Sequence, residues 1–357
     1  MIKRGTKKVK VAILFGYSGT GFYGMQIQSG GVHTIEQEML NALNEADMIA
    51  KCNANDTNKV NLMRCARTDK GVHALGQVIN LKLDLKMDDL VEARRQLNLI
   101  LPESFRVWDI LRTTKAFHSK DHCSSRHYNY WLPTYIFEKS EKPKDSYRAS
   151  TEVLEKLQSI LNAYVGTHKF HNFTNKVSGK EDKARRHMIK IVASPPIVVG
   201  YPENSRAENG EWIKVHIHGQ SFMLHQIRKM MAMAIFIIRY NLEPFKYFPL
   251  IFQEDTKFDI PKAPALGLLL HHPDFDFYHK KLEQLMETNT AFEQRPKIDF
   301  SLYDSEIDAF FHEHIFPSMV NEELQGTDSF VGWLTYLEVE KPEYLQHLLQ
   351  LNAKLDK

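Results

Sequence analysis

Alternation of apolar and polar residues with a period of two is the feature that most limits how this chain can fold. In Gln77–Leu85, isoleucine and leucine occupy every second position from residue 79, with polar side chains between them. His127–Tyr135 and Ile213–His218 alternate in the same way. This period predicts strands with one buried and one polar face, the pattern typical of antiparallel sheets. Lys8–Tyr17 is a nearly continuous run of β-forming residues and predicts a buried strand.

Segments with helical periodicity separate these strands. Thr34 and Gln37 form a capping-box pattern in front of a helix whose apolar face includes Met39. Asp88–Ile100 predicts a second helix, which Pro102 ends. Further elements are expected at Phe105–Leu111 (a strand), at Leu154–Val165 and Met223–Tyr240 (helices), and over residues 291–357 (helical).

These elements together predict an α+β protein of two α/β halves around a central, mostly antiparallel sheet that helices flank. Residues 1–118 would form the N-terminal half and residues 119–290 the C-terminal half. Residues 291–357 would form a helical C-terminal extension. The charged stretch Glu138–Asp145 predicts a linker or surface loop.

Composition excludes some classes of protein but identifies no partner. Apolar residues make up 43% of the chain and charged residues 25%, as in an ordinary soluble globular protein. The three cysteines, Cys52, Cys65 and Cys123, include no CxxC pair, so we expect neither a disulfide framework nor a cysteine-rich zinc site, and expect a reducing compartment. The longest apolar run, Met230–Ile238, is too short to span a bilayer. A net charge of +2 does not by itself indicate a nucleic-acid partner, so that case depends on where the charges lie.

The most unusual segment is Arg64–Ala74, RCARTDKGVHA. Its eleven residues include three cations, one carboxylate at Asp69 and one imidazole. Asp-Lys-Gly favours a turn, so we expect a loop that presents Asp69 at the edge of the following strand. Nearby arginines would favour an ionised carboxylate, which suits a nucleophile or an electrostatic stabiliser acting on an anionic substrate. A solvated turn with surface ion pairs explains the same composition, and spacing alone does not separate the two interpretations.

The segment ARTDKGVHA at Ala66–Ala74 resembles the signature of the TruA family of tRNA pseudouridine synthases. Five further segments resemble motifs of that family in the same order, so the resemblance spans roughly residues 8–275. Several are most similar to the eukaryotic multisite branch, the pseudouridine synthases of type one and two. His168–Thr174 and the tail beyond residue 296 also resemble that branch. The five segments are FGYSGTGFYGMQIQ at Phe15–Gln28, LNLILPESFRVWDI at Leu97–Ile110, SSRHYNYWLPTY at Ser124–Tyr135, HGQSFMLHQIRKM at His218–Met230 and APALGLLL at Ala263–Leu270.

The resemblance implies an isomerase that converts specific uridines of tRNA to pseudouridine in an active cleft between the two halves. Asp69 would be the catalytic carboxylate, and Arg67 would help to displace the target base from its stack. Tyr128 would lie against the uracil, near the proton lost from C5. Arg228 would pair with Asp69 and hold it in place. In this branch the targets include uridines at the top of the anticodon stem, around tRNA positions 26–28.

The chemistry agrees with these implied roles. Pseudouridine formation breaks a C–N glycosidic bond, turns the uracil and makes a C–C bond. A carboxylate near the ribose could attack C1′ or abstract a sugar proton, and the sequence leaves both open. The base must first leave its stack, which costs a few kcal/mol. An arginine wedge and a stacking tyrosine suit that step. The reaction is expected to need no cofactor.

Cations and aromatic residues in these segments are candidates for holding the RNA, because phosphate contacts supply much of the affinity of such complexes. Any one of them is also explained as a solvated surface residue. The resemblance adds two residues that would line the pocket, Gly267 and Leu268. The other candidate substrate-binding residues are Arg64, Lys70, His73, Arg126, Tyr130, Arg185, Arg186 and Lys229, with Lys120 and Lys190 as further cations.

Several of these residues have structural alternatives. A tyrosine at position 128 or 130 of a half-buried strand is usually part of the core. Arg228 could extend to solvent or, if buried, would need a carboxylate partner. The histidine pairs 168/171 and 216/218 raise the question of zinc. His216 and His218 should share one exposed strand face, and His168 and His171 have no cysteine or glutamate at ligand spacing, so zinc is not expected.

Two other functions explain part of the sequence. A hydrolase of glycosidic bonds would want a second carboxylate motif, which the chain does not offer. A tRNA-binding protein without catalysis would not need Asp69, Tyr128 and Arg228 together. Val9–Phe15 runs into a turn, so no secretory signal is expected. A short basic leader, and no acidic residue before Glu36, favour a mitochondrial location over a nuclear one. We expect a monomer, with a homodimer as the alternative.

Overall fold

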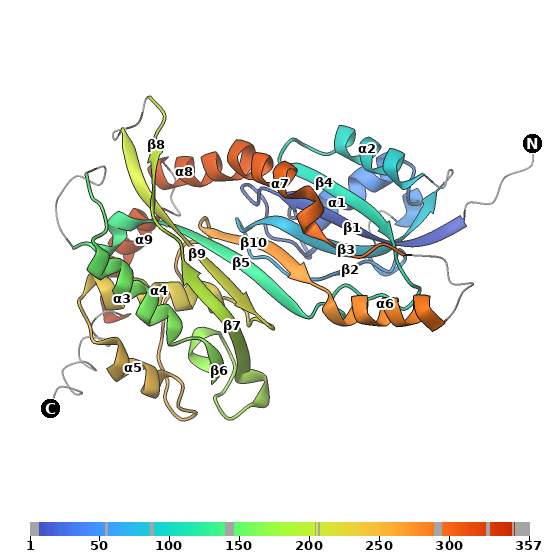
Figure 1. Cartoon of the computed structure of the whole chain (residues 1–357). Coiled ribbons are helices and arrows are strands. Elements are labelled where there is room, and N and C mark those ends of the chain that lie inside the picture. The colour runs from blue at the N-terminus through green and yellow to red at the C-terminus, as the bar shows by residue number, and fades with distance from the viewer. Residues whose placement is uncertain are drawn as a thin grey trace, which may run out of the picture. The chain divides into compact units, whose positions relative to one another are not determined.

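The computed structural model describes residues 7–53, 56–85, 89–139, 146–203, 205, 208–288, 295–325, 329–344 and 346. The chain forms two compact units (Figure 1). Unit 1 comprises Met1–Arg126 and Leu269–Ser318, and unit 2 comprises His127–Leu268 and Met319–Lys357. Each unit combines helices with strands, so the α+β class predicted from the sequence is confirmed. The domain boundaries expected after residues 118 and 290 stay a prediction.

Antiparallel pairing dominates the strands of unit 1. Strand β1 (Lys7–Tyr17) pairs antiparallel with β3 (His73–Leu85) on one side and with β4 (Phe105–Arg112) on the other. The short β2 (Met63–Arg64) adds to β3 in the same sense. Strand β10 (Leu268–Asp274) pairs with β3 in parallel. The strands in the order β4-β1-β3-β10 therefore form both antiparallel and parallel pairs. The predicted strands are thus present.

The first two helices of unit 1 have side-chain caps at their starts, and the cap at Thr34 was predicted. Thr34 caps α1 (Ile35–Glu45), since its side chain accepts a hydrogen bond from the Gln37 amide. Asp89 caps α2 (Leu90–Ile100) by accepting from two amides of the first turn. The expected start at residue 88 lies outside the described residues, as do residues 140–145 of the predicted surface loop.

One detail of the alternation in β3 is wrong. Asn80 was expected on the polar face but is 1% exposed. Its side-chain oxygen accepts a hydrogen bond from the Ser119 amide at 2.7 Å, which satisfies a polar group that burial would otherwise penalise. The strand also begins four residues earlier than predicted, because the turn before it ends at Gly71, whose φ is +76°.

Unit 2 contains a second group of strands with its own helices. Its strands are β5 (Ser125–Pro133), β6 (Gly166–Lys169), β7 (Arg185–Ala193), β8 (Ile197–Gly200) and β9 (Asn209–Gly219). They follow the order β5-β9-β7-β6, and β8 pairs with β9. The helices are α3 (Thr151–Asn162), α4 (Gln226–Arg239) and α5 (Pro244–Ile251).

Helix α4 forms much of the core of unit 2. Twelve of its fourteen residues are buried, which confirms that the apolar run in this segment is an interior helix. Among the described residues, no helix is long and apolar enough to cross a membrane.

The C-terminal region is helical, as predicted. It follows α6 (Asp276–Thr288) and contains α7 (Asp304–Phe310), α8 (Phe316–Gln325) and α9 (Phe330–Thr335). Two π-helical turns, Phe311–Ile315 and Tyr336–Glu340, continue α7 and α9. The remaining short elements are 3₁₀ turns at Lys51–Asn53, Thr134–Phe137, His171–Phe173, Asp182–Ala184 and Phe300–Tyr303.

Candidate active-site residues

Asp69 lies half-buried in the loop between β2 and β3, at the edge of β3. The Val72 amide donates to the Asp69 carbonyl at 3.2 Å and closes the turn that the Asp-Lys-Gly sequence predicts. Gly71 occupies the left-handed region that this turn requires. The loop therefore has a defined conformation at the carboxylate.

The glycine-rich loop after β1 holds the Asp69 loop from one side. The Met25 amide donates to the Thr68 carbonyl at 3.1 Å. A Cβ atom at Gly24 would lie 2.7 Å from the same carbonyl oxygen, and the φ of Gly24 is +90°. Tyr17 adds a buried hydrogen bond of 2.8 Å between its hydroxyl and Thr68 Oγ1. Three contacts thus fix the residue that directly precedes Asp69.

Two further contacts hold the residues at the start of the Asp69 loop. Gln77 Nε2 donates to the Ala66 carbonyl at 3.1 Å. Arg64 donates from Nε to the carboxylate of Glu36, whose side chain is 0% exposed and also accepts from the Ile27 amide at 3.0 Å. Burial raises the pKa of Glu36, and the Arg64 guanidinium opposes that rise. Arg64 was predicted to bind substrate, but here it neutralises a buried carboxylate.

The other predicted cations of this loop are exposed. The side chain of Arg67 is exposed, as a base-displacing wedge requires. Lys70 is also exposed, with its ammonium 4.7 Å from the centroid of the Tyr23 ring. Both residues are therefore accessible to a polyanion.

Two further predicted substrate-binding residues of unit 1 make internal contacts. His73 is 1% exposed, and its Nδ1 accepts from the Gly19 amide at 3.1 Å. Its ring therefore positions the glycine-rich loop and offers no exposed surface. Arg126, the last residue of the first segment of unit 1, donates to the Cys65 carbonyl at 2.7 Å and so supports the start of the Asp69 loop.

In unit 2, the two predicted tyrosines lie on the same face of β5, and both are buried. Tyr128 is 6% exposed and meets the ring of Phe222 edge-on, with centroids 5.0 Å apart. Tyr130 is fully buried, and its hydroxyl donates to the Pro264 carbonyl at 2.7 Å. Burial raises the pKa of Tyr130, and the nearby Arg228 guanidinium opposes this. Tyr130 is accordingly a core residue, whereas Tyr128 contacts the loop that precedes α4.

The segment before β10 joins α4 to β5. Arg228, in the first turn of α4, donates to the Ala263 carbonyl at 2.6 Å and accepts from the Ala263 amide through its own carbonyl. The Trp131 amide donates to the Gly267 carbonyl at 2.8 Å. A Cβ atom at Gly267 would lie 2.1 Å from the Trp131 carbonyl oxygen, so only glycine allows this approach. Leu268, at the start of β10, is 8% exposed.

The remaining predicted cations of unit 2 differ in exposure. Lys229 is 5% exposed, its Nζ donates to the Thr174 carbonyl at 3.4 Å, and burial lowers its pKa. It therefore presents no open phosphate contact. Arg185 is exposed, whereas Arg186 donates to the Lys183 carbonyl at 2.6 Å and to the Arg185 carbonyl.

His168 and His171, the first histidine pair considered for zinc, make contacts with different partners. The His168 ring stacks on Phe252 with centroids 4.3 Å apart, and its Nε2 lies 2.9 Å from the Val165 carbonyl. His171 Nε2 instead lies 2.9 Å from the Thr256 carbonyl. The two rings thus serve different parts of the packing of unit 2.

The second pair belongs to a group of three rings. His216 and His218 lie on one face of β9, as predicted, and His127 of β5 joins them. His127 Nδ1 is 3.1 Å from His216 Nε2, and the His127 ring stacks on His218 with centroids 3.8 Å apart. Sequence reasoning missed His127, because its proximity depends on the pairing of two distant strands.

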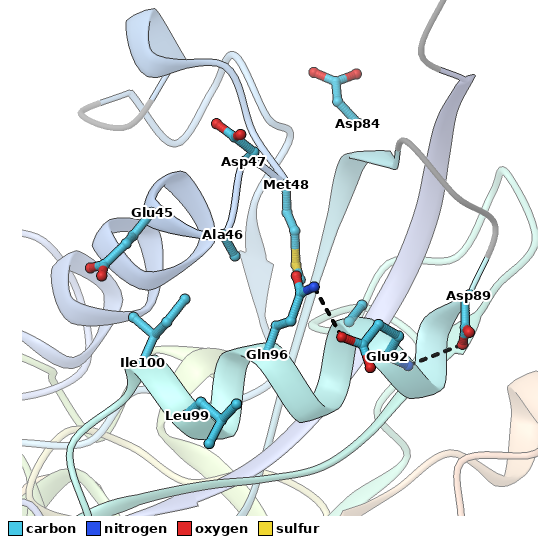
Figure 2. A pocket seen from close by; sticks show the side chains of 11 residues that line it. Glu45, Ala46, Asp47, Met48, Asp84, Asp89, Glu92, Gln96, Leu99 and Ile100 are labelled. Carbon is cyan, nitrogen blue, oxygen red and sulfur yellow. Dashed lines mark hydrogen bonds between the residues drawn. The ribbon is translucent and has the colours of Figure 1, made fainter.

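A pocket of about 540 Å³ lies in unit 1 beside α1 and α2 (Figure 2). Carboxylates surround it, and its apolar lining comes from Met48, Leu99 and Ile100. None of the predicted site residues line it, and its charge is opposite to the one that would attract RNA. The carboxylates are those of Glu45, Asp47, Asp84, Asp89 and Glu92.

Comparison with known proteins defines the class of protein to which this chain belongs. Residues 160–276 match the family described as tRNA pseudouridine synthase. The tRNA pseudouridine synthase 1 of Kluyveromyces lactis is 36% identical to this chain, over 94% of this chain and 71% of that protein. The mouse pseudouridylate synthase 1 homolog is 35% identical over 94% of this chain and 75% of its own length, and the human homolog is 34% identical over 92% and 73%. The chain therefore belongs to the tRNA pseudouridine synthase family that its motifs predict.

Proposed function

We propose that this chain converts uridines at the top of the anticodon stem, around tRNA positions 26–28, to pseudouridine with Asp69 as the catalytic carboxylate. Membership of the family makes the chain an isomerase that acts on tRNA. The observation that supports Asp69 is its placement. A half-buried carboxylate follows Thr68, which the glycine-rich loop and Tyr17 hold in position.

Such preorganisation is what either possible mechanism needs. A carboxylate that attacks C1′ and one that abstracts a sugar proton must both reach the ribose in a fixed geometry, because misplacement by about 1 Å can cost on the order of 10²-fold in rate. Arg67 is exposed two residues before Asp69, and in this proposal it takes the place of the displaced base. That replacement offsets the few kcal/mol of unstacking.

The remaining site residues follow the same proposal. Tyr128 contacts the uracil and stays against the base while it turns after the glycosidic bond breaks. Leu268 and Gly267 shape the base pocket, with Gly267 fixed by its approach to Trp131. The pairing of Arg228 with Asp69 stays a prediction.

Mapping of the product tests the position. Unmodified tRNA transcripts incubated with the protein would be treated with a pseudouridine-specific carbodiimide and read by primer extension. The proposal predicts stops at the uridines around positions 26–28. Stops elsewhere alone would refute the assigned position but leave the isomerase standing. Release of free uracil would instead favour a hydrolase of glycosidic bonds. Tight binding of unchanged RNA would favour a tRNA-binding protein without catalysis.

We also propose a mitochondrial location and a monomeric state, with the nucleus and a homodimer as alternatives. The location rests on a basic first segment and on the lack of any acidic residue before Glu36. Fractionation of cells that express the untagged chain, followed by immunoblotting, tests it. Sedimentation equilibrium gives the mass of the particle, for which 41.5 kDa indicates the monomer.

A further inference from the structure

Lys229 is a buried lysine that no step of the proposed reaction uses. It follows Arg228 in α4, is 5% exposed, and donates from Nζ to the Thr174 carbonyl at 3.4 Å. Burial lowers its pKa, and the exposed Asp259 carboxylate opposes that change. Burying an ammonium costs free energy, so this lysine is placed at the expense of stability. Its contact with Thr174 is therefore a candidate for a role in function.

Thr174 contacts both α4 and the loop that precedes this helix. Its carbonyl accepts from Lys229, and its hydroxyl donates to the Leu224 carbonyl at 2.9 Å. Thr174 is 8% exposed, so both bonds lie in a low-dielectric environment that strengthens them. The next residue adds a contact, because Asn175 Nδ2 lies 3.5 Å from His225 Nδ1. We call Thr174 and Lys229 together the clamp.

The loop of residues 222–225 ends in a strained conformation that needs such support. His225, the N-cap residue of α4, has a φ of +64°, which is unfavourable for a residue with a Cβ atom. Strained residues persist where surrounding contacts over-determine them, and they cluster at functional sites. Gln226 makes one such contact, since its Oε1 accepts from the Met223 amide at 2.9 Å. The clamp makes another on the same loop.

The same loop reaches the tyrosine that is proposed to contact the base. Phe222 lies at the start of the loop and meets Tyr128 edge-on, with ring centroids 5.0 Å apart. The Phe222 ring packs closely on Gly219, where a Cβ atom would lie 2.8 Å from it. A shift of residues 222–225 would therefore move the ring against which Tyr128 packs.

We propose that Thr174 and Lys229 are positioning residues for Tyr128, an inference that rests on the proposed function. Lys229 holds the carbonyl of Thr174, and the Thr174 hydroxyl holds the loop of residues 222–225. The loop then presents Phe222 to the tyrosine. The clamp thereby fixes the orientation of the Tyr128 ring while the uracil turns against it. Its effect falls on the rate of the reaction and leaves the affinity for tRNA unchanged.

A purely structural role is the alternative, and the buried charge separates the two roles. Lys229→Met keeps a flexible side chain of similar length and removes the ammonium, so the cost of burying that charge disappears. We expect this variant to react more slowly than the wild type, although it unfolds at the same or a higher urea concentration. A residue that only supported the fold would not lower the rate in a protein of undiminished stability.

Thr174 provides the matched set of variants. Thr174→Val removes the hydroxyl at nearly constant volume, and Thr174→Ser restores it. Thr113→Val is the control, because Thr113 is 6% exposed and its hydroxyl donates to the Lys10 carbonyl in unit 1. The rate is measured as tritium release from tRNA labelled at C5 of uridine in single-turnover reactions with saturating protein. The affinity for tRNA is measured by fluorescence anisotropy.

We expect Thr174→Val to react about tenfold more slowly and Lys229→Met several-fold more slowly, because misplaced groups at a reacting centre cost rate. The affinity of both variants for tRNA should stay within about twofold of the wild type, since the clamp acts after binding. Thr174→Ser and Thr113→Val should react within about twofold of the wild-type rate.

Combined variants test the route through Phe222. Phe222→Leu removes the ring against Tyr128, so adding Thr174→Val to it should slow the reaction by less than about a further twofold. Fully additive losses would overturn the proposal, and so would a wild-type rate in both clamp variants. A slower rate that Thr174→Ser does not restore, or that accompanies a lower unfolding midpoint in Lys229→Met, would leave a structural role instead. A wild-type protein that forms no pseudouridine would refute the proposed function, and the positioning role with it, before any substitution is compared.

Discussion

The hydroxyls of Tyr17 and Thr68 form a buried hydrogen-bonded pair at the residue that directly precedes Asp69 in sequence. Tyr17 is 0% exposed, and its hydroxyl is 2.8 Å from Thr68 Oγ1. Tyr17→Phe keeps the ring but removes the bond, so we expect about 1 kcal/mol of lost stability. We also expect kcat to fall about tenfold with KM nearly unchanged, because the carboxylate loses part of its support. Urea unfolding and steady-state kinetics measure the two effects.

Thr68→Ser provides the control for that prediction. It keeps a hydroxyl at the same atom, so kcat should stay close to that of the wild type. If Tyr17→Phe leaves kcat unchanged, the hydroxyl pair has no part in positioning Asp69.

Glu36 makes stability depend on pH in a specific direction. Burial raises the pKa of Glu36 above its ordinary value of 4.5. Between the unfolded and folded values the native protein holds the proton more tightly, so stability falls as pH rises through that window. Glu36→Gln cannot titrate and should lack this decline. Chemical unfolding of both proteins between about pH 4 and 7 tests this, and equal slopes would contradict it.

The turn at Asp69 could be predicted from the sequence, whereas the burial of other candidate site residues could not. The turn was predictable because Asp-Lys-Gly specifies it locally. His73 and Lys229 were expected to meet RNA, yet both are buried. Their burial goes with contacts to the distant Gly19 amide and Thr174 carbonyl. No local sequence pattern indicates these contacts.

At the scale of elements, the close approach of two loops is the feature most open to test. Gly24 combines a φ of +90° with a Cβ position 2.7 Å from the Thr68 carbonyl, whereas Gly21 has a φ of +82° and no atom within 4 Å of its Cβ position. Both alanine variants incur the cost of a left-handed residue, about 1–2 kcal/mol. Gly24→Ala must also displace the Asp69 loop, so we expect it to lose activity and at least about 1 kcal/mol more stability than Gly21→Ala. Thermal unfolding and kinetics of the two variants decide this, and matching losses would show that the loops do not need their contact.

Most elements were predictable because their signals are local. Period-two alternation located β3, β5 and β9, and Thr34 located the start of α1. The parallel pairing of β10 with β3 was not foreseen, since it joins residues 196 positions apart (269 − 73) and neither strand has a sequence pattern that identifies its partner. The buried Asn80 was missed for a related reason, because the amide that satisfies it comes from a loop.

At the scale of the whole molecule, the C-terminal helices are part of the core of each unit. In unit 1, Phe310 of α7 is 3% exposed and meets Trp108 of β4 edge-on at 5.6 Å. In unit 2, Trp333 of α9 stacks on Phe236 of α4 at 5.5 Å. The region predicted as an extension is thus continuous with both packed interiors.

Phe310→Ala tests this integration. Loss of a buried aromatic ring should reduce the free energy of unfolding by about 3–5 kcal/mol. Leu302→Ala, at a side chain that is 72% exposed in the same region, should change it by less than about 0.5 kcal/mol. Equal and small effects in urea unfolding would mean that the C-terminal helices pack loosely on unit 1.

Isomerisation of tRNA uridines by this family member is proposed to depend on Asp69. Release of tritium from tRNA labelled at C5 of uridine tests it most directly, because C5 loses its hydrogen only when the new C–C bond is made. Wild type and Asp69→Asn would be compared on unfractionated tRNA in parallel. We expect release by the wild type and none above background by the Asp69→Asn variant. Equal release by both proteins would contradict the role of Asp69, and no release by the wild type would contradict the isomerase activity itself.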